Sequence, residues 1–349
     1  MVRIGFRLNA NFKTGSGHLQ RCLALASGLK ETNSDCEIFF LTSSSSDYKD
    51  KIIDPGFVFV DLGPVSTTHE NLEATKDAIK HHELKILVVD SYEIDENFMK
   101  TLKKEILLVV FDDFIHLKSY HSHILVNPTA YAHTLPYQCD EDTKLFLGTE
   151  FVQIRKEFDQ YEDFERQNPE QAKHVLVSFG GSDPKGATLL TVKALKSLPN
   201  PFSVSVVVGK TFKNSEALAK EIGLDSRFIV LQDISDISKK MAMCDLAIVS
   251  PSTTFYELAF FRIPTILIVQ ADNQEMVADY AGKNELAISL GDIRHINYDL
   301  LANTISALIQ NRAERDRMSA RLDDMVDGLG RFRLAEEILK LYKEKTETI

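Results

Sequence analysis

The chain alternates short runs of β-branched and aromatic residues with stretches of helical periodicity along almost its whole length. Strands that alternate with helices in this way form parallel sheets covered by helices. In the first half, the expected strands are 2–8, 37–41, 57–60, 86–90, 107–111 and 123–126, and the expected helices are 18–30, 71–81 and 95–104. In the second half, they are strands 174–179, 203–208, 228–231, 246–250, 265–269 and 287–290, and helices 187–197, 214–222, 234–242, 253–261 and 274–283. The pattern predicts an α/β protein built from two open parallel sheets.

A polar, charge-rich stretch at 157–173 separates the two halves. Such a segment is typical of a domain boundary, so we expect an N-terminal domain at 1–160 and a C-terminal domain at 170–349. The second domain is expected to include an amphipathic C-terminal helix at 331–344. Ligands of open α/β sheets bind at the carboxyl ends of the strands. We therefore expect two sheets that face a central cleft, lined by the loops that follow the strands.

The charge and cysteine content exclude several classes of protein. The 349 residues carry a formal net charge of −11, which argues against a nucleic-acid partner, because phosphates select for clustered Lys and Arg. Four scattered cysteines form no C-x-x-C pair, which favours reduced thiols over a disulfide framework. No signal peptide and no apolar run of membrane-spanning length is visible. We expect a monomeric cytoplasmic protein with no membrane partner.

A histidine stands where a glycine-rich turn leads into a helix, in Gly15-Ser16-Gly17-His18. The flanking glycines let a ligand approach the backbone closely. The positive end of the helix disfavours protonation of a nearby imidazole, and a neutral histidine can act as a general base. A cap or a packed side chain is the alternative for His18. We predict that His18 is catalytic.

Loops in the second half have the composition of anion sites. Gly180-Gly181-Ser182-Asp183 follows a strand and precedes a helix, so its amides can meet a phosphate; an ordinary turn capped by Ser182 or Asp183 is the alternative. Ser252, Thr253 and Thr254 open another helix, and Glu257 lies one turn inside it. Glu257 can accept two hydrogen bonds from a ribose diol, or it can form a capping box with Thr254. Asn273 and Gln274 follow the next strand and suit recognition of a sugar or base, although such residues are more often caps.

Polar residues also end two strands of the first half. Asp90-Ser91-Tyr92 ends one strand, and Asp112-Asp113 ends another. Asp90 can orient His18 or a water molecule, and Tyr92 can donate to a sugar hydroxyl. No histidine or cysteine at ligand spacing accompanies the carboxylates, so we expect neither a metal nor another cofactor.

Taken together, these loops resemble the PseG family of hydrolases and the wider GT-B group of nucleotide-sugar proteins that includes MurG. PseG enzymes cleave UDP-2,4-diacetamido-2,4,6-trideoxy-β-L-altropyranose in pseudaminic acid biosynthesis. The matching stretches run in the same order along nearly the whole chain: Phe6-Arg7, Gly15 to Leu23, Val89 to Tyr92, Phe111 to Asp113, Val126 to Tyr131, Leu147 to Phe158, Ser178 to Asp183, Ser252 to Glu257 and Ala271 to Gln274.

The resemblance implies two Rossmann-like domains, with UDP held mainly by the second. His18 matches the family's general base, Tyr92 the tyrosine that ends the D-x-Y strand, and Glu257 the glutamate that contacts the ribose. We expect His18 and Tyr92 to be catalytic. The expected substrate contacts are Arg7, Gly17, Arg21, Asp90, Gly181, Ser182, Asp183, Ser252, Thr253, Glu257, Asn273 and Gln274.

The resemblance also implies hydrolysis of the UDP-sugar to UDP and free sugar, with inversion at C1 and without a metal. The chain departs from the family pattern at Asn9, Ser91, Gly186 and Pro251, which leaves open a different UDP-sugar of surface polysaccharide synthesis. A MurG-like glycosyltransferase, in which an acceptor hydroxyl replaces water, is the first alternative. A non-catalytic nucleotide-sugar binder is the second.

Overall fold

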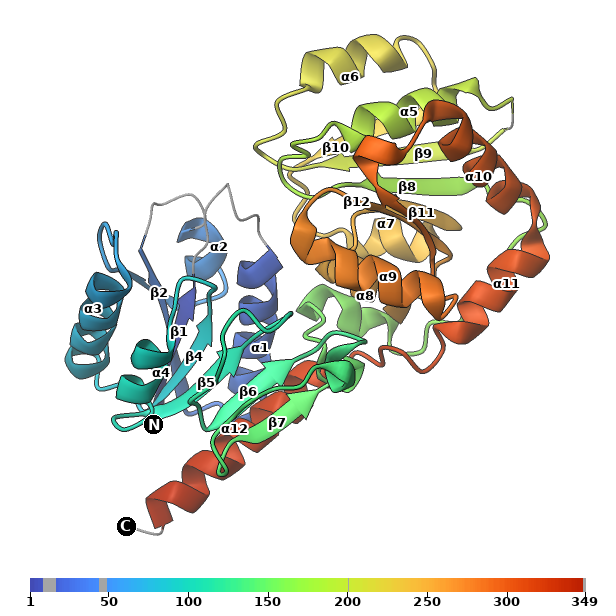
Figure 1. Ribbon diagram of the computed structural model, residues 1–349. Helices are drawn as coiled ribbons and strands as arrows, with labels where there is room; N and C mark the ends of the chain where they lie inside the picture. The colour runs from blue at the N-terminus through green and yellow to red at the C-terminus, as the bar shows by residue number, and fades with distance from the viewer. Residues whose placement is uncertain (9–16, 44–48, 200, 348–349) are drawn as a thin grey trace. The chain divides into compact units, whose positions relative to one another are not determined.

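The computed structural model describes residues 1–8, 17–43, 49–199 and 201–347. These residues form two compact units, one made of Met1–Lys156 together with Gly328–Ile349, the other of Glu157–Asp327. Each unit has one parallel sheet with helices on both faces (Figure 1). The predicted α/β class with two parallel-sheet domains is confirmed.

Unit 1 contains a seven-stranded sheet in the order β3-β2-β1-β4-β5-β6-β7. Its strands are β1 (Val2–Leu8), β2 (Cys36–Thr42), β3 (Val58–Asp61), β4 (Ile86–Asp90), β5 (Leu107–Phe111), β6 (Ile124–Asn127) and β7 (Lys144–Leu147). Its α-helices are α1 (Gly17–Thr32), α2 (Lys49–Ile53), α3 (Thr68–His81), α4 (Glu96–Leu102) and α12 (Gly330–Glu347). β7 was not predicted, because its apolar run, Leu145 to Leu147, is only three residues long and none of its four residues is fully buried.

Unit 2 contains a six-stranded sheet in the order β10-β9-β8-β11-β12-β13. Its strands are β8 (His174–Ser178), β9 (Ser203–Val208), β10 (Phe228–Gln232), β11 (Leu246–Val249), β12 (Thr265–Val269) and β13 (Ile288–Asp292). Its α-helices are α5 (Ala187–Ser197), α6 (Ser215–Ile222), α7 (Ser238–Met243), α8 (Thr253–Phe260), α9 (Glu275–Lys283), α10 (Tyr298–Gln310) and α11 (Arg312–Arg321). Short 3₁₀ turns include η5 (Asp272–Gln274).

The strand orders place one topological switch point in each sheet. The chain winds outward in opposite directions from β1 and β4 in unit 1, and from β8 and β11 in unit 2. At such a point the loops beyond the two central strands separate and leave a crevice at the carboxyl ends of the strands. His18 and Asp90 follow or end the central strands of unit 1, and Gly180 and Ser252 follow those of unit 2.

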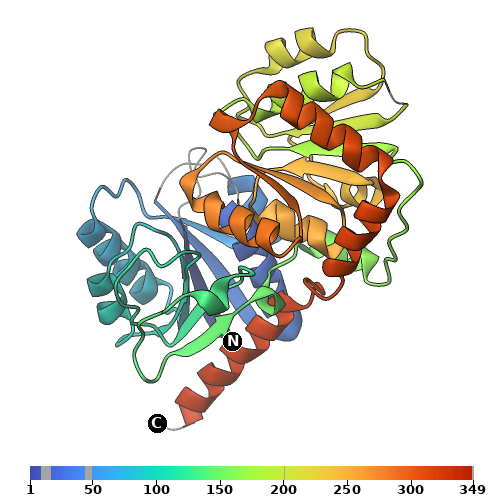
Figure 2. The ribbon, with the colours of Figure 1, turned by 45° about the vertical axis from the view of Figure 1, so that its right-hand side comes forward.

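The C-terminal helix corrects the predicted domain division. The chain returns to unit 1 at Gly328, so α12 does not belong to the second domain as expected. Leu334, Ala335 and Ile338 of α12 are wholly buried in the core that Leu25 and Leu29 of α1 also occupy. Both views of the ribbon show α12 running beneath the first sheet (Figures 1 and 2). An amphipathic pattern predicts that a helix buries one face, but it does not name the surface that covers that face.

Glycines allow this docking at two close contacts. A Cβ at Gly28 of α1 would lie 2.9 Å from the carbonyl oxygen of Arg331, and one at Gly330 would lie 2.3 Å from that of Val152. Only a residue without a side chain fits at either position. The start of α12, where the chain returns to unit 1, therefore packs closely against α1 and the segment around Val152.

Candidate active site

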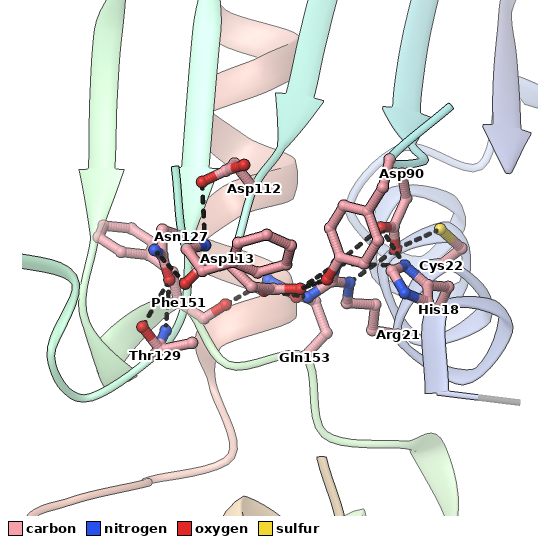
Figure 3. A network of polar contacts seen from close by, with 12 residues as sticks. His18, Arg21, Cys22, Asp90, Asp112, Asp113, Asn127, Thr129, Phe151 and Gln153 are labelled. Atoms are coloured by element: carbon pink, nitrogen blue, oxygen red, sulfur yellow. Dashed lines mark hydrogen bonds and ion pairs between the residues drawn. The ribbon is translucent and has the colours of Figure 1, made fainter. Parts of the chain in front are cut away.

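A charged cluster lies at the switch point of unit 1, where side chains from α1 meet the ends of β4 and β5. Figure 3 shows His18, Arg21 and Cys22 of α1 converging on Asp90, the last residue of β4. Asp113 reaches the same cluster from the loop after β5. Residues from three separate predicted loops are thus brought together. Gly17, which begins α1, lies next to His18, whereas Gly15 and Ser16 are outside the described residues.

The contact between His18 and Asp90 is the one that bears on base catalysis. His18 Nδ1 lies 2.5 Å from Oδ1 of Asp90. The Asp90 side chain is wholly buried, and that of His18 is 17% exposed. Since a carboxylate only accepts, the neutral imidazole carries its proton on Nδ1 and has its lone pair on Nε2. Burial alone would raise the pKa of Asp90, but Arg21 and His18 hold it well below its usual range.

Arg21 joins the two carboxylates of the cluster. Its Nε donates to Oδ2 of Asp90 at 2.6 Å and its Nη2 to Oδ1 at 2.6 Å. Nη1 and Nη2 also donate to Asp113, at 2.7 and 3.1 Å. The guanidinium lies 4.9 Å from the ring centroid of Phe111. Arg21 was expected to contact substrate; the structure instead buries it, with all three nitrogens directed at protein carboxylates.

Tyr92 is held between the cluster and an aromatic group. Its hydroxyl donates to Oδ2 of Asp113. Its ring lies edge-on to His18 and packs against Phe114, with centroids 4.9 Å apart. Burial, followed by the charge of Asp113, raises the pKa of Tyr92 far above its usual value. Its proton is therefore committed to Asp113, and the expected role as a donor to the sugar does not match this hydrogen bond.

Asp112 organises the loop that follows β5. Its buried carboxylate accepts from the amides of Phe114 and Ile115 at 3.1 and 2.7 Å, from the hydroxyls of Tyr120 and Tyr137 at 2.8 and 2.6 Å, and from His116 Nδ1. The two tyrosines were not singled out in the sequence, and no local pattern distinguishes them from ordinary core residues.

The main chain of Asp113 is fixed from the neighbouring strand. Asn127 Nδ2 and the Tyr131 hydroxyl donate to the carbonyl of Asp113, at 3.2 and 2.8 Å. Asn127 in turn accepts from the amide and hydroxyl of Thr129, at 2.9 and 2.7 Å. Asp113 is therefore anchored through its backbone as well as its carboxylate.

Arg7 does not join the cluster. It is 1% exposed and donates to Oδ1 of Asn71 at 2.9 Å and to the carbonyl of Leu8 at 2.7 Å. Burial lowers its pKa to about 10, against the opposing effect of Glu93. These bonds link β1 to α3, and the contact of Arg7 with substrate stays a prediction.

In unit 2, the loop between β8 and α5 is shaped by its glycines and closed by an aspartate. Gly180 has a φ of +78°, in the left-handed region. A Cβ at Gly209 would lie 2.5 Å from the backbone of Gly181, which brings these two loops into contact. Asp183 is 2% exposed and accepts from the amides of Ala187 and Thr188, at 2.9 and 2.8 Å. Asp183 thus caps α5, the alternative that the sequence left open, while Ser182 beside it is half-buried.

The start of α8 presents backbone amides. Ser252 is the N-cap residue but makes no side-chain capping hydrogen bond; its hydroxyl is directed at the carbonyl of Ser250, 3.4 Å away. Because Ser252 is the N-cap and the helix begins at Thr253, Thr254 does not stand at the N-cap position that a capping box with Glu257 requires. Glu257 is 7% exposed, one turn into the helix.

Gln270, which was not predicted as a site residue, links the ends of three strands. It follows β12 directly, and its Nε2 donates to Ser250 Oγ at 3.1 Å and to the carbonyl of Phe179 at 3.5 Å. Its Oε1 is buried and has no hydrogen-bond partner among the residues that the structure describes. The backbone N–H of Gln270 donates to Oε1 of Gln274 at 2.8 Å. The side chain of Gln274 therefore bonds to the backbone of its own loop. Asn273, beside it in η5, is exposed.

The described residues contain neither a candidate metal site nor a helix that could span a membrane. Within them, no group of three or more His, Cys, Asp or Glu side chains is arranged to hold a metal ion. None of the helices in these ranges combines the length and the apolarity needed to cross a bilayer.

Comparisons with known proteins give distant relatives along the whole chain, although no protein-family model matches it. A Campylobacter jejuni protein named UDP-2,4-diacetamido-2,4,6-trideoxy-beta-L-altropyranose hydrolase is 24% identical over 81% of this chain and 97% of its own length. The spore coat polysaccharide biosynthesis protein SpsG of Bacillus subtilis is 22% identical over 99% and 100%. The uncharacterized protein MJ1062 of Methanocaldococcus jannaschii is 26% identical over 99% and 67%.

Several solved structures that are similar in fold to this chain are named as glycosyltransferases. MurG of Acinetobacter baumannii matches with a TM-score of 0.68 and 13% identity, over 97% of this chain and 100% of its own. The spinosyn rhamnosyltransferase SpnG, complexed with thymidine diphosphate, matches with a TM-score of 0.67 and 13% identity, over 95% and 99%. The chain is thus a distant homologue of PseG-type hydrolases, and it has the GT-B fold of MurG.

Proposed function

We propose that the chain hydrolyses a UDP-linked 2,4-diacetamido-2,4,6-trideoxyhexose, UDP-2,4-diacetamido-2,4,6-trideoxy-β-L-altropyranose, to UDP and the free sugar in pseudaminic acid biosynthesis. The observation that carries this proposal is the 2.5 Å contact between His18 Nδ1 and Asp90, at the switch point of unit 1. The similarity to the Campylobacter hydrolase, over nearly all of that protein, supports the choice of substrate.

In the proposed reaction, His18 acts as the general base. Its Nε2 takes a proton from a water molecule while the water oxygen bonds to C1 of the sugar. The bond between C1 and the UDP oxygen breaks on the opposite face, so the configuration at C1 is inverted and the electron pair leaves with UDP. Asp90 keeps the imidazole in the tautomer with Nε2 unprotonated and stabilises the imidazolium that forms.

Nucleotide recognition is assigned to unit 2. The uncapped amides at the start of α8 and those of the loop at Gly181 and Ser182 are suited to the diphosphate. Glu257 is proposed to accept from the ribose hydroxyls, and Asn273 and Gln274 to contact polar groups of the nucleotide. Fixed helix amides neutralise the leaving group in this proposal, so a chelator should leave the rate unchanged.

A glycosyltransferase that uses a UDP-sugar donor is the second candidate, because several solved structures that are similar in fold are named as glycosyltransferases. The hydrolase could also act on a different UDP-sugar of polysaccharide synthesis, which the name of SpsG, a spore coat polysaccharide biosynthesis protein, supports.

One experiment separates these candidates. The protein is incubated with the UDP-diacetamido sugar alone in H₂¹⁸O, with His18→Ala as the matched control. We expect one ¹⁸O in the sugar, none in UDP, and a first-formed anomer of inverted configuration by NMR. Release of UDP only when an acceptor is added would instead identify a transferase.

A further inference from the structure

We propose that Arg21 is the positioning residue of this site, and that it sets both His18 and Tyr92 through the two carboxylates it joins, without contacting substrate. This inference rests on the proposed function for its kinetic consequences, although its structural consequence can be measured without any substrate.

The first argument comes from how Asp90 is held. The recorded donors to its carboxylate from the described residues are three side chains of α1: His18, Arg21 and, at 3.5 Å, the thiol of Cys22. Asp112, by contrast, also accepts from backbone amides, such as that of Ile115. A carboxylate without backbone donors takes its orientation from its side-chain partners, and the two bonds from Arg21 are the bidentate contact among them. The direction of the Asp90 oxygen that meets His18 therefore depends on Arg21.

The second argument comes from Asp113. Its carboxylate accepts from Nη1 and Nη2 of Arg21 and from the hydroxyl of Tyr92. The same guanidinium therefore sets the carboxylate that holds Tyr92. The rings of His18 and Tyr92 touch edge-on, with centroids 5.0 Å apart. The guanidinium of Arg21 thus positions both His18 and Tyr92, whose rings are in contact.

The third argument is the charge of the cluster. Two carboxylates and one guanidinium leave one net negative charge beside His18, with Tyr92 and Cys22 uncharged. When His18 gains a proton, the cluster becomes neutral. Arg21 thus lets Asp90 orient the imidazole while offsetting one of the two negative charges, of which that of Asp90 is buried and that of Asp113 is partly exposed. Among the described residues, the charged or titratable groups in contact with His18 are Asp90 and Tyr92 from other elements, and Arg21 of its own helix, whose Nη2 lies 3.4 Å from His18 Nδ1.

Two variants separate orientation from charge. Arg21→Lys keeps the charge but cannot donate two parallel hydrogen bonds to Asp90. We expect kcat to fall about 10- to 100-fold from misplacement of the base, while the acid limb of the pH profile and the affinity for UDP stay unchanged. Arg21→Met removes the charge, so the uncompensated carboxylates favour protonated His18. We expect its acid limb to move to higher pH by about one unit.

A double variant and a second arginine serve as controls. Arg21→Met with Asp113→Asn restores one net negative charge, so its acid limb should return toward that of the wild type while kcat stays low. Arg331→Lys changes another wholly buried arginine of unit 1, which donates to the carbonyl of Ile154 at 3.1 Å. It should lower the unfolding temperature without changing the pH profile, as expected for a purely structural arginine.

The decisive readout is the tautomer of His18, measured by ¹⁵N NMR of histidine-labelled protein and assigned with His18→Gln. We expect a proton on Nδ1 in the wild type and a mixed population of tautomers in Arg21→Lys. An unchanged tautomer together with an unchanged kcat in Arg21→Lys would overturn the inference. If the wild type releases no UDP from any UDP-sugar, the proposed function fails, but the tautomer measurement still decides the role of Arg21.

Discussion

The ring of Tyr92 meets the imidazole of His18 edge-on, with an interplanar angle of 82° and 5.0 Å between the ring centroids. Two further contacts hold Tyr92 in this position: Phe114 packs against its ring, and its hydroxyl donates to Asp113. The tyrosine therefore forms a fixed wall beside the base. Because its hydroxyl donates to Asp113, we expect Tyr92 to act through the shape of its ring and not as a proton donor.

Replacement of Tyr92 by phenylalanine tests this role. Tyr92→Phe keeps the ring and loses only the hydrogen bond to Asp113, so we expect kcat to fall less than about tenfold, within the range of one lost hydrogen bond. Tyr92→Ala removes the wall and should cost about 10²-fold through loss of orientation. Steady-state kinetics of the two variants check this. A phenylalanine variant as inactive as the alanine variant would mean that the hydroxyl acts on substrate.

Asp90→Asn tests the orientation of the base. An asparagine can present its amide to His18, which reverses the tautomer and places the proton on Nε2, where it blocks base catalysis. We expect a loss of about 10²–10⁴-fold in kcat, the usual size of base catalysis, with UDP affinity unchanged by calorimetry. Asp90→Glu, which keeps the charge, should recover part of the activity.

The same carboxylate affects stability at low pH. Because the pKa of Asp90 is lowered by folding, its stabilisation is fully present above about pH 4, the unfolded value, and is lost as the pH falls below it. The unfolding temperatures of wild type and Asp90→Asn should therefore differ by a constant amount from pH 8 to 5 and converge below pH 4. A difference that already narrows at pH 6 would contradict the lowered pKa.

Features of the site that follow directly from strand order could be predicted from the sequence. The strand ends place Asp90 near the start of α1, and orientation of His18 by Asp90 was one of the roles considered for it. The fork of Arg21 onto Asp113 could not be predicted, because it depends on the side-chain directions of α1 relative to β5. The same is true of Arg7. The alternation of side chains along β1 cannot predict that Arg7 bonds to Asn71.

The capping role of Asp183 and the domain to which α12 belongs could not be decided from the sequence for a different reason. A carboxylate at a strand-to-helix turn can cap the helix or meet a ligand, and both readings use the same residue types at the same spacing. The amphipathic pattern of α12 likewise fits either unit. In both cases the partner is distant in sequence or belongs to the backbone, so no local pattern identifies it.

His123 is expected to make unit 1 less stable under mildly acidic conditions. Burial, followed by the charges of Lys345 and Lys103, lowers its pKa to about 4, and its Nδ1 accepts from the amide of Leu108 at 3.0 Å. The unfolded state then binds more protons between about pH 6.5 and 4. Stability should fall as the pH decreases through this range. His123→Gln should have a flatter dependence of unfolding temperature on pH; equal slopes would contradict the assignment.

Docking of α12 onto unit 1 can be tested at two positions. In Gly330→Ala the new Cβ would collide with the carbonyl of Val152, so we expect a loss of about 1–3 kcal/mol in unfolding free energy. In Leu334→Ala a wholly buried side chain is truncated, at about 2–5 kcal/mol. Gly63→Ala, where no atom lies within 4 Å of the added Cβ, controls for added bulk, although its positive φ adds a small strain. Denaturant unfolding measures all three.

The amides at the start of α8 offer a test of nucleotide binding that leaves the helix intact. Thr253 is the first residue of α8, where proline is tolerated because its missing N–H has no partner within the helix. Ser252 before it is extended, with φ −148° and ψ −167°, and so lies outside the helical region that a following proline disfavours. Thr253→Pro therefore removes one backbone donor while the fold is kept. If that amide binds the diphosphate, UDP affinity should fall about tenfold, the size of one hydrogen bond to a charged group. Thr253→Ala removes the hydroxyl but keeps the amide, so a loss of the same size in the alanine variant would assign the contact to the side chain instead. Calorimetric titration with UDP, alongside thermal unfolding of each variant, distinguishes these outcomes.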